Sequence, residues 1–151
     1  MAISESTASG GPPLELLNAA NRVDFDLPAT AECVTEARRY VRQVLGTWHL
    51  ASDSREAAAL VVSELITNAV VHTDTRTVTC VLAATGHQTL IQVEDHGTGC
   101  AVPTPQLPMP DWERGRGLML VEAMSRHWGT VPSENGRGGR VVWATLNTAA
   151  E

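Results

Sequence analysis

The sequence predicts an α+β protein: a two-layer α/β sandwich in which a mixed, mostly antiparallel sheet carries helices on one face. Two segments, residues 31–45 and 55–72, carry apolar residues at helical spacing. The β-rich segments come in pairs joined by short turns, as antiparallel neighbours do. The chain of 151 residues is long enough for one core and shows no internal repeat. We therefore expect one folded domain over residues 21–148, preceded by a loose, flexible tail over residues 1–20.

The first half of this domain is predicted to run from a strand through two helices. Residues 22–27 alternate apolar residues with charged ones, which predicts a short strand. The first helix is expected to end near Gly46, and the second to begin after Ser52. Because the second helix contains an uninterrupted apolar run over residues 57–62, we expect it to be the most buried helix.

The second half is predicted to hold two pairs of strands, separated by a long loop and a helix. Residues 77–83 and 89–94 read as a hairpin across a short turn. Residues 96–114 contain glycines and prolines that break the helical spacing as well as the strand alternation of apolar residues. A loop of this length in a small domain is usually functional or mobile. The remaining elements are a helix from about Gly117 and strands near residues 128–131 and 140–146.

Composition excludes several classes of function. The net charge of -6 disfavours direct binding to nucleic acid through its phosphates. All eleven basic residues are arginines, and the absence of lysine excludes the Walker P-loop and Schiff-base chemistry. The apolar stretches are far shorter than the roughly 20 residues of a bilayer span, and the N-terminus does not resemble a signal peptide. We expect a cytoplasmic protein without a membrane segment, in which Cys33, Cys80 and Cys100 are free thiols.

A polar stripe runs along the second predicted helix. Glu64, Asn68 and His72 recur at i, i+4 and i+8, so they lie on one side of the helix. Apolar residues at helical spacing border the stripe, which is where the wall of a cleft would lie. An ordinary solvated helix rim has the same pattern. We assign His72 to the C-terminal end of the helix rather than to chemistry.

Two glycine-containing segments follow in the sequence. A predicted strand runs into Asp95, and Gly97 and Gly99 come shortly after it. An aspartate at a strand end can accept a hydrogen bond from a ligand amine, and glycines allow the backbone to approach that ligand, although a simple turn uses the same residues. Gly115 and Gly117 lead into a helix N-terminus, where free amides favour phosphate; a flexible helix start is the alternative. Neither segment has the third glycine of a dinucleotide-binding motif.

Together the three segments resemble the N, G1 and G2 boxes of the GHKL superfamily, the histidine-kinase-like ATPases that include gyrases and histidine kinases. Within this superfamily the chain is most similar to the small anti-sigma-factor serine/threonine kinases. The resemblance covers about residues 23–147 and rests on residues 61–69, 94–99 and 115–118. It implies the histidine-kinase-like ATPase fold and a site for ATP with Mg²⁺.

The resemblance also implies a role for each motif residue. Glu64 would be the catalytic general base for phosphotransfer. Asn68 would be the metal ligand, binding Mg²⁺ through its side-chain oxygen beside the phosphates. Asp95 would accept a hydrogen bond from the adenine amino group. The remaining nucleotide-binding positions would be Gly97, Gly99, Gly115, Gly117 and Leu118.

The implied function is that of an ATP-dependent protein-serine kinase and anti-sigma factor, hence a regulator of transcription. The implied partners are a sigma factor and an anti-anti-sigma factor, contacted through Arg38 on the first helix, and a homodimer is the expected assembly. Residues 100–114 contain no basic residue before Arg114 to reach the γ-phosphate, so a nucleotide-binding interaction module without kinase activity is the alternative. A third possibility is a detached catalytic domain that phosphorylates a histidine on a separate protein.

Overall fold

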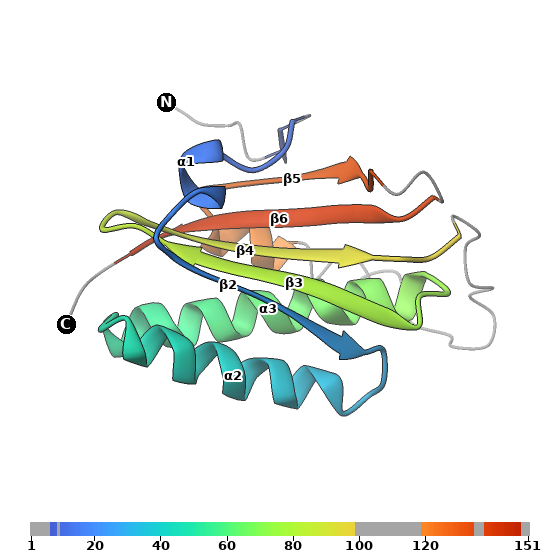
Figure 1. Ribbon diagram of the computed structural model, residues 1–151, viewed down its shortest axis with the longest axis horizontal. Coiled ribbons are helices and arrows are strands. Elements are labelled where there is room, and N and C mark those ends of the chain that lie inside the picture. The colour runs from blue at the N-terminus through green and yellow to red at the C-terminus, as the bar shows by residue number, and fades with distance from the viewer. Residues whose placement is uncertain (1–6, 9, 99–118, 135–137, 149–151) are drawn as a thin grey trace.

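The sheet and helices of the computed structural model confirm the predicted α+β class (Figure 1). The structure describes residues 7–8, 10–98, 119–134 and 138–148. Its six strands lie in the order β1-β5-β6-β4-β3-β2; β1 pairs with β5 in parallel, and the pairings of the other described strands are antiparallel. The elements are β1 (Thr7–Ala8), α1 (Leu14–Leu17), β2 (Asn21–Pro28), α2 (Cys33–Thr47), α3 (Ser52–His72), β3 (Thr77–Ala84), β4 (Gln88–Asp95), β5 (His127–Pro132) and β6 (Arg140–Asn147).

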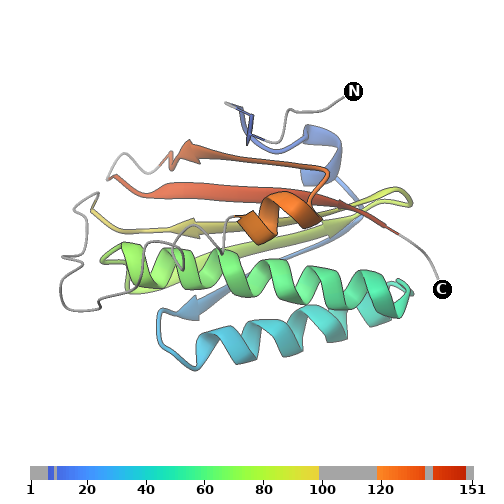
Figure 2. The ribbon, with the colours of Figure 1, turned by 180° about the vertical axis from the view of Figure 1, so that it is seen from behind.

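The long helices α2 and α3 cover one face of the sheet, which we call the inner face (Figure 2). Helix α3 packs between α2 and strands β4 and β6, and the helical residues 119–124 add Val121 to the same core. From β3, Cys80 and Leu82 point into this core, because alternate residues of a strand face the same side. Each fully buried apolar side chain of this size contributes roughly 1.5–3 kcal/mol. The buried residues of α3 are Ala58, Ala59, Val61, Val62, Ser63, Leu65, Ile66 and Ala69.

The opposite, outer face of the sheet is partly covered by the N-terminal residues, and here the structure differs from the predicted loose tail. Leu16 of α1 is fully buried against Val81 and Trp143, in a second and smaller core. The Trp143 Nε1–H donates to the carbonyl oxygen of Gly10 over 3.1 Å. Burial of one leucine stabilises by roughly 1.5–3 kcal/mol, so Leu16 is one of the contacts that hold this segment on the sheet. The described residues from 10 to 20 are therefore part of the folded domain.

The predicted elements are observed with small shifts of their bounds. The helix expected over residues 31–45 is α2, Cys33–Thr47, and the second expected helix is α3, which ends at His72. The start of the third helix, near Gly117, lies outside the described residues. Of the helices that the structure describes, none combines the length and the apolar character that a membrane span requires.

Candidate functional site

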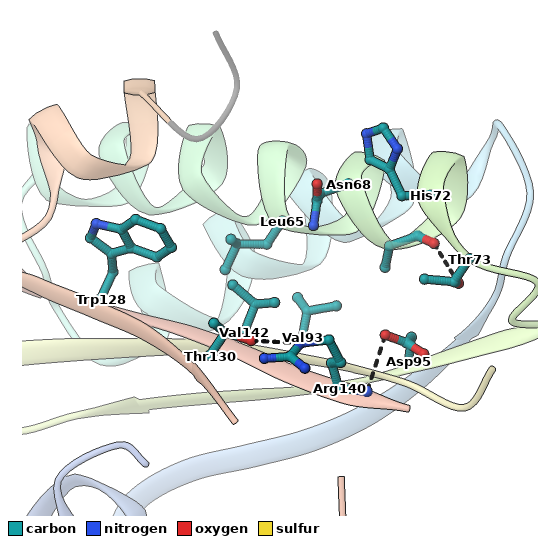
Figure 3. Close-up of a pocket in the computed structure, with 11 residues that line it drawn as sticks. Leu65, Asn68, His72, Thr73, Val93, Asp95, Trp128, Thr130, Arg140 and Val142 are labelled. Carbon is teal, nitrogen blue, oxygen red and sulfur yellow. Dashed lines mark hydrogen bonds between the residues drawn. The ribbon is translucent and has the colours of Figure 1, made fainter. Parts of the chain in front are cut away.

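A cavity of about 310 Å³ lies between the C-terminal part of α3 and the inner face of the sheet (Figure 3). Sites for small molecules have volumes of roughly 300–1,000 Å³ and apolar walls with a few polar groups. The cavity has this composition, since aliphatic and aromatic side chains alternate with an amide, a carboxylate and a guanidinium. Its lining residues are Leu65, Asn68, Ala69, His72, Thr73, Val93, Asp95, Trp128, Thr130, Arg140 and Val142.

Helix α3 forms one wall of the cavity. Leu65, Asn68, Ala69 and His72 line it, because residues three and four apart lie on the same side of a helix. The predicted polar stripe is therefore brought to the cavity at Asn68 and His72, whose side chains are both half-buried. Glu64 lies one turn before Asn68 and is also half-buried, but it is not among the lining residues.

Asp95 lies on the sheet wall of the cavity, at the end of β4, and only 5% of it is exposed. The backbone N–H of Gly97 donates to Oδ1 over 3.0 Å, and that of Arg140 donates to Oδ2 over 3.2 Å. Within the described part of the chain the carboxylate forms no ion pair. A carboxylate has about four acceptor positions, so both oxygens can still accept from a ligand. The arrangement suits a ligand that presents an N–H group.

Two glycines allow the backbone to close around Asp95. A Cβ atom at Gly97 would lie 2.5 Å from the Asp74 Oδ1 atom and 3.2 Å from Asp95 Oδ1. A Cβ atom at Gly139 would collide with the carbonyl oxygen of Asp95. Only glycine fits such close contacts without moving its neighbours. The structure thus gives the predicted Gly97 a place beside Asp95 and adds Gly139.

The segment after Asp95 is fastened to the turn between α3 and β3. Asp74 Oδ1 accepts from the Thr98 N–H over 2.9 Å, and Oδ2 accepts from the Thr98 hydroxyl over 2.7 Å. Hydrogen bonds from the hydroxyl and then the amide of Thr98 lower the pKa of the Asp74 carboxyl, because they favour its charged form. The His96 N–H likewise donates to Thr75 Oγ1 over 2.9 Å. These bonds fix the direction in which the chain leaves Asp95.

Arg140 is a lining residue that sequence analysis missed. Its Nε–H donates to Thr130 Oγ1 over 3.0 Å, and both residues line the cavity. Strand alternation contained the signal, because Arg140 shares its face of β6 with Val142 and Ala144, which are apolar. A charged residue in register with an apolar face is a candidate for a site. The hydrogen bond between Arg140 and Asp95 arises from the tertiary fold and could not be predicted from the sequence.

Arg38, the predicted partner contact, is not among the cavity residues. It lies on α2, where its Nη1 donates to Ser63 Oγ on α3 over 3.4 Å, and it is half-buried. Ser63 directly precedes Glu64, so Arg38 lies against the part of α3 that carries the predicted general base. Its contact with another protein stays a prediction.

Of the predicted site residues, Asn68 and Asp95 meet at the cavity, and Gly97 lies beside Asp95. Among the described residues, no group of three or more His, Cys, Asp or Glu side chains could hold a metal ion. A Mg²⁺ ion at Asn68 would therefore need ligands from a bound phosphate and from water, which is the arrangement that the resemblance implies. Four further predicted positions lie outside the described residues: Gly99, Gly115, Gly117 and Leu118.

Solved structures share this architecture. A structure of the RsbU and RsbW domains of Rv1364c from Mycobacterium tuberculosis matches with a TM-score of 0.59 and 20% identity, over 84% of this chain and 32% of that chain. A chain of the SiaB–SiaC complex from Pseudomonas aeruginosa matches with a TM-score of 0.52 and 12% identity, over 83% of this chain and 89% of that chain. At these identities the likeness shows the fold alone. No curated protein sequence is detectably similar to this chain.

The sequence profile of the histidine kinase-like ATPase domain matches residues 27–146. The match extends from the end of β2 through β6, and it contains both walls of the cavity, with Asn68 on the helix and Asp95 on the sheet. It confirms the superfamily to which the three sequence segments pointed. The chain belongs to the histidine kinase-like ATPase domain family.

Proposed function

We propose that the chain binds ATP in the cavity between α3 and the sheet, and that it acts as an anti-sigma factor and a protein-serine kinase whose substrate is an anti-anti-sigma factor. The observation that carries the proposal is that Asn68 and the buried Asp95 line one cavity. The family resemblance assigns Mg²⁺ to the first residue and the adenine amino group to the second. The fold of the family supports the ATP-binding part of the proposal.

The base would lie at the sheet wall. Asp95 offers acceptor oxygens held in place by backbone amides, so little reorganisation is needed to accept an amino group. Leu65 and Val93 line the cavity on opposite walls and would contact the two sides of a flat base. Burial in such a site strengthens a hydrogen bond, because the surrounding dielectric constant is lower than that of water.

The phosphates would lie toward α3. Asn68 would hold Mg²⁺ together with phosphate oxygens and water, and the bound ion would neutralise developing charge. Residues i and i+4 of a helix have Cβ atoms roughly 5–6 Å apart, so Glu64 can reach a hydroxyl group that approaches a phosphate near Asn68. This spacing supports Glu64 as the general base. Gly115 and Gly117 remain the proposed phosphate positions, and Leu118 remains a proposed nucleotide-binding position.

The proposed partners are a sigma factor and an anti-anti-sigma factor with a phosphorylatable Ser or Thr, and the proposed assembly is a cytoplasmic homodimer. The resemblance to anti-sigma-factor kinases supports these assignments. Of the two solved structures described above, one contains RsbU and RsbW domains and the other is a SiaB–SiaC complex. Arg38 is the proposed contact, since its side chain is half-buried and therefore retains a solvent-facing part.

The second candidate is a nucleotide-binding interaction module without kinase activity. Two observations favour it: Glu64 is not a lining residue of the cavity, and residues 100–114 contain no basic residue before Arg114. Glu64→Ala separates the candidates. It should abolish transfer of phosphate to the partner while leaving ATP affinity within about twofold, because Glu64 would act only on the attacking hydroxyl. Partner regulation in cells that is unchanged by Glu64→Ala would select the interaction module.

The first experiment is calorimetric titration of ATP, with and without Mg²⁺, into the wild type and Asp95→Asn. A lost hydrogen bond to a charged group amounts to about 1.5–3 kcal/mol, so the variant should bind at least about tenfold more weakly. Asp26→Asn is the matched control, because its exposed carboxylate accepts from Thr79 and does not line the cavity. Absence of binding at millimolar ATP would overturn the proposal. Acid-labile phosphate on the partner would indicate histidine rather than serine as the acceptor.

A further inference from the structure

We propose that Arg140 is a specificity residue of this site, whose guanidinium donates a hydrogen bond to a ring nitrogen of the adenine that Asp95 holds by its amino group. This inference rests on the proposed function, because it requires a purine in the cavity. It assigns a second contact to the base, from a residue for which the resemblance implies no role.

The sheet places the two residues side by side. Glu94 pairs with Val141 in the antiparallel register of β4 and β6, so Asp95 and Arg140 are the next pair along the ladder. The Arg140 N–H accordingly donates to Asp95 Oδ2 over 3.2 Å. Both side chains line the cavity, and Figure 3 shows them on the same wall.

The two opposite charges nevertheless do not neutralise each other. No ion pair joins Arg140 and Asp95 in the described structure. The guanidinium turns instead along the sheet, where Nε donates to Thr130 Oγ1 over 3.0 Å (Figure 3). A guanidinium has five N–H donors, and the described residues supply an acceptor for Nε alone. The wall therefore presents free donors next to a carboxylate that can still accept.

This pair of groups matches one edge of adenine. The 6-amino group is a donor, and the ring nitrogens on either side of it, N1 and N7, are acceptors. With the amino group on Asp95, a neighbouring ring nitrogen faces the guanidinium. Guanine has a carbonyl oxygen at the same place, which would face the Asp95 carboxylate and be repelled. Arg140 and Asp95 together would therefore select adenine over guanine.

The surroundings of Arg140 favour the base rather than the phosphates as its ligand. The lining residues next to Arg140 on the sheet wall, Val93 and Val142, are apolar and suit a ring. A phosphate at this wall would lie close to the Asp95 carboxylate and would be repelled by it. Asn68, the proposed phosphate-side residue, belongs to the helix wall.

The test is Arg140→Met, which keeps the length of the side chain and removes its donors. Calorimetry with adenosine, AMP, ADP and ATP should show an affinity loss of about tenfold that is the same for all four ligands, because the contact is to the base. The adenosine analogues 1-deaza- and 7-deaza-adenosine each lack one of the two ring nitrogens. One of them should bind the wild type about tenfold more weakly than adenosine does. The same analogue should bind Arg140→Met as well as adenosine does. Arg42→Met is the control, since Arg42 pairs with Glu56 at the surface and should leave every affinity unchanged.

Three outcomes would overturn the inference. An affinity loss that increases with the number of phosphates would make Arg140 a phosphate ligand. If Arg140→Met and the wild type bind with equal affinity, Arg140 makes no contact with the base. The same conclusion follows if the deaza ligands lose the same affinity for both proteins. If the wild type binds none of the ligands, the proposed function itself fails. That result differs from one in which the wild type binds ATP and Arg140→Met binds it equally well, which overturns only the role of Arg140. Urea unfolding of the variant checks that it is folded.

Discussion

The inner face of the sheet is covered by helices of 15 and 21 residues, whereas the outer face is covered in part by a helix of four. The inner layer is large enough to contain both a continuous core and the cavity with Asn68 and Asp95. The outer layer contains a small core around Leu16 and Trp143. Apolar surface is therefore buried on both faces of the sheet, but the polar groups that line the cavity all lie on the inner side.

The difference teaches how a sheet can serve stability and binding at the same time. On the inner face, α3 packs tightly through residues such as Val61 and Val62, and its last turns carry Asn68 and His72 at the cavity. On the outer face, Val81 and Leu90 are covered by Leu16. The second core adds to the free energy of unfolding without occupying the wall that would receive the ligand.

The largest predicted effect is on the inner core. Leu82 on β3 is 1% exposed and belongs to the inner core beneath the helices. Leu82→Ala should lower the free energy of unfolding by about 3–5 kcal/mol, because surrounding strands and helices cannot collapse into the space. Urea unfolding followed by circular dichroism measures the loss. A loss below about 1 kcal/mol would mean that the inner layer repacks freely, contrary to the comparison.

The outer core should be less costly to disturb. Leu16 is fully buried, but α1 is one helical turn and can shift toward the sheet. Leu16→Ala should therefore lower the free energy of unfolding by only about 2–3 kcal/mol, at the low end for a buried leucine. The matched control is Leu14→Ala, since Leu14 is 72% exposed and its loss should change stability by less than about 0.5 kcal/mol. Equal stability of both variants would show that residues 10–20 behave as the tail that the sequence predicted.

The third prediction concerns the polar end of the inner face. A Cβ at Gly97 would lie 2.5 Å from Asp74 Oδ1, which Thr98 holds in place. Gly97→Ala should weaken ATP binding about tenfold, because the chain would shift next to Asp95. Asp74→Ala removes the colliding atom, so the double variant should bind no more weakly than Gly97→Ala alone. Calorimetry on the three variants decides: strictly additive losses would mean that this contact is not the cause.

Much of the fold could be predicted because local patterns determine it. Helical spacing located α2 and α3, and the alternation in residues 22–27 located β2. The outer core was missed although a signal existed. Residues 81–84 are an unbroken apolar run, and a strand with that pattern is buried on both faces. Something had to cover the outer face, and the N-terminal segment was one of the two segments to which no packed element had been assigned.

The site was predictable to the extent that its residues belong to sequence motifs. Asn68 and Asp95 stand in such motifs, and both line the cavity. Arg140 and Asp74 stand in no such motif. Strand register brings Arg140 to Asp95, and the turn after α3 brings Asp74 to Thr98. Contacts between residues 24 or 45 positions apart follow from the tertiary fold, which a single sequence does not specify at the level of atoms.

The smallest effect contrasts an exposed carboxylate of the outer face with the buried Asp95. Arg22 donates to Asp24 over 2.7 Å, and this bond lowers the pKa of the Asp24 carboxyl below its ordinary value. Because the folded-state pKa is the lower one, the stabilisation is present above the unfolded pKa of about 3.9 and is lost as pH falls through the folded value. The Arg22 and Asp24 side chains are both more than a third exposed, at 34% and 51%, so water and salt screen the pair.

Asp24→Asn should therefore lower the free energy of unfolding at pH 7 by only about 0.2–1 kcal/mol. The difference from the wild type should disappear in strongly acidic solution and shrink in about 1 M salt, where the Debye length is ~3 Å. Urea unfolding across a pH series measures both dependences, and Arg22→Gln should reproduce them because it removes the other partner of the same bond. A loss at pH 7 that persists in acid and in salt would mean that Asp24 stabilises the outer face by packing rather than by charge. In that case Asp24 would resemble Asp95 of the inner face, a buried carboxylate held by backbone amides, in depending on its surroundings rather than on an exposed ion pair.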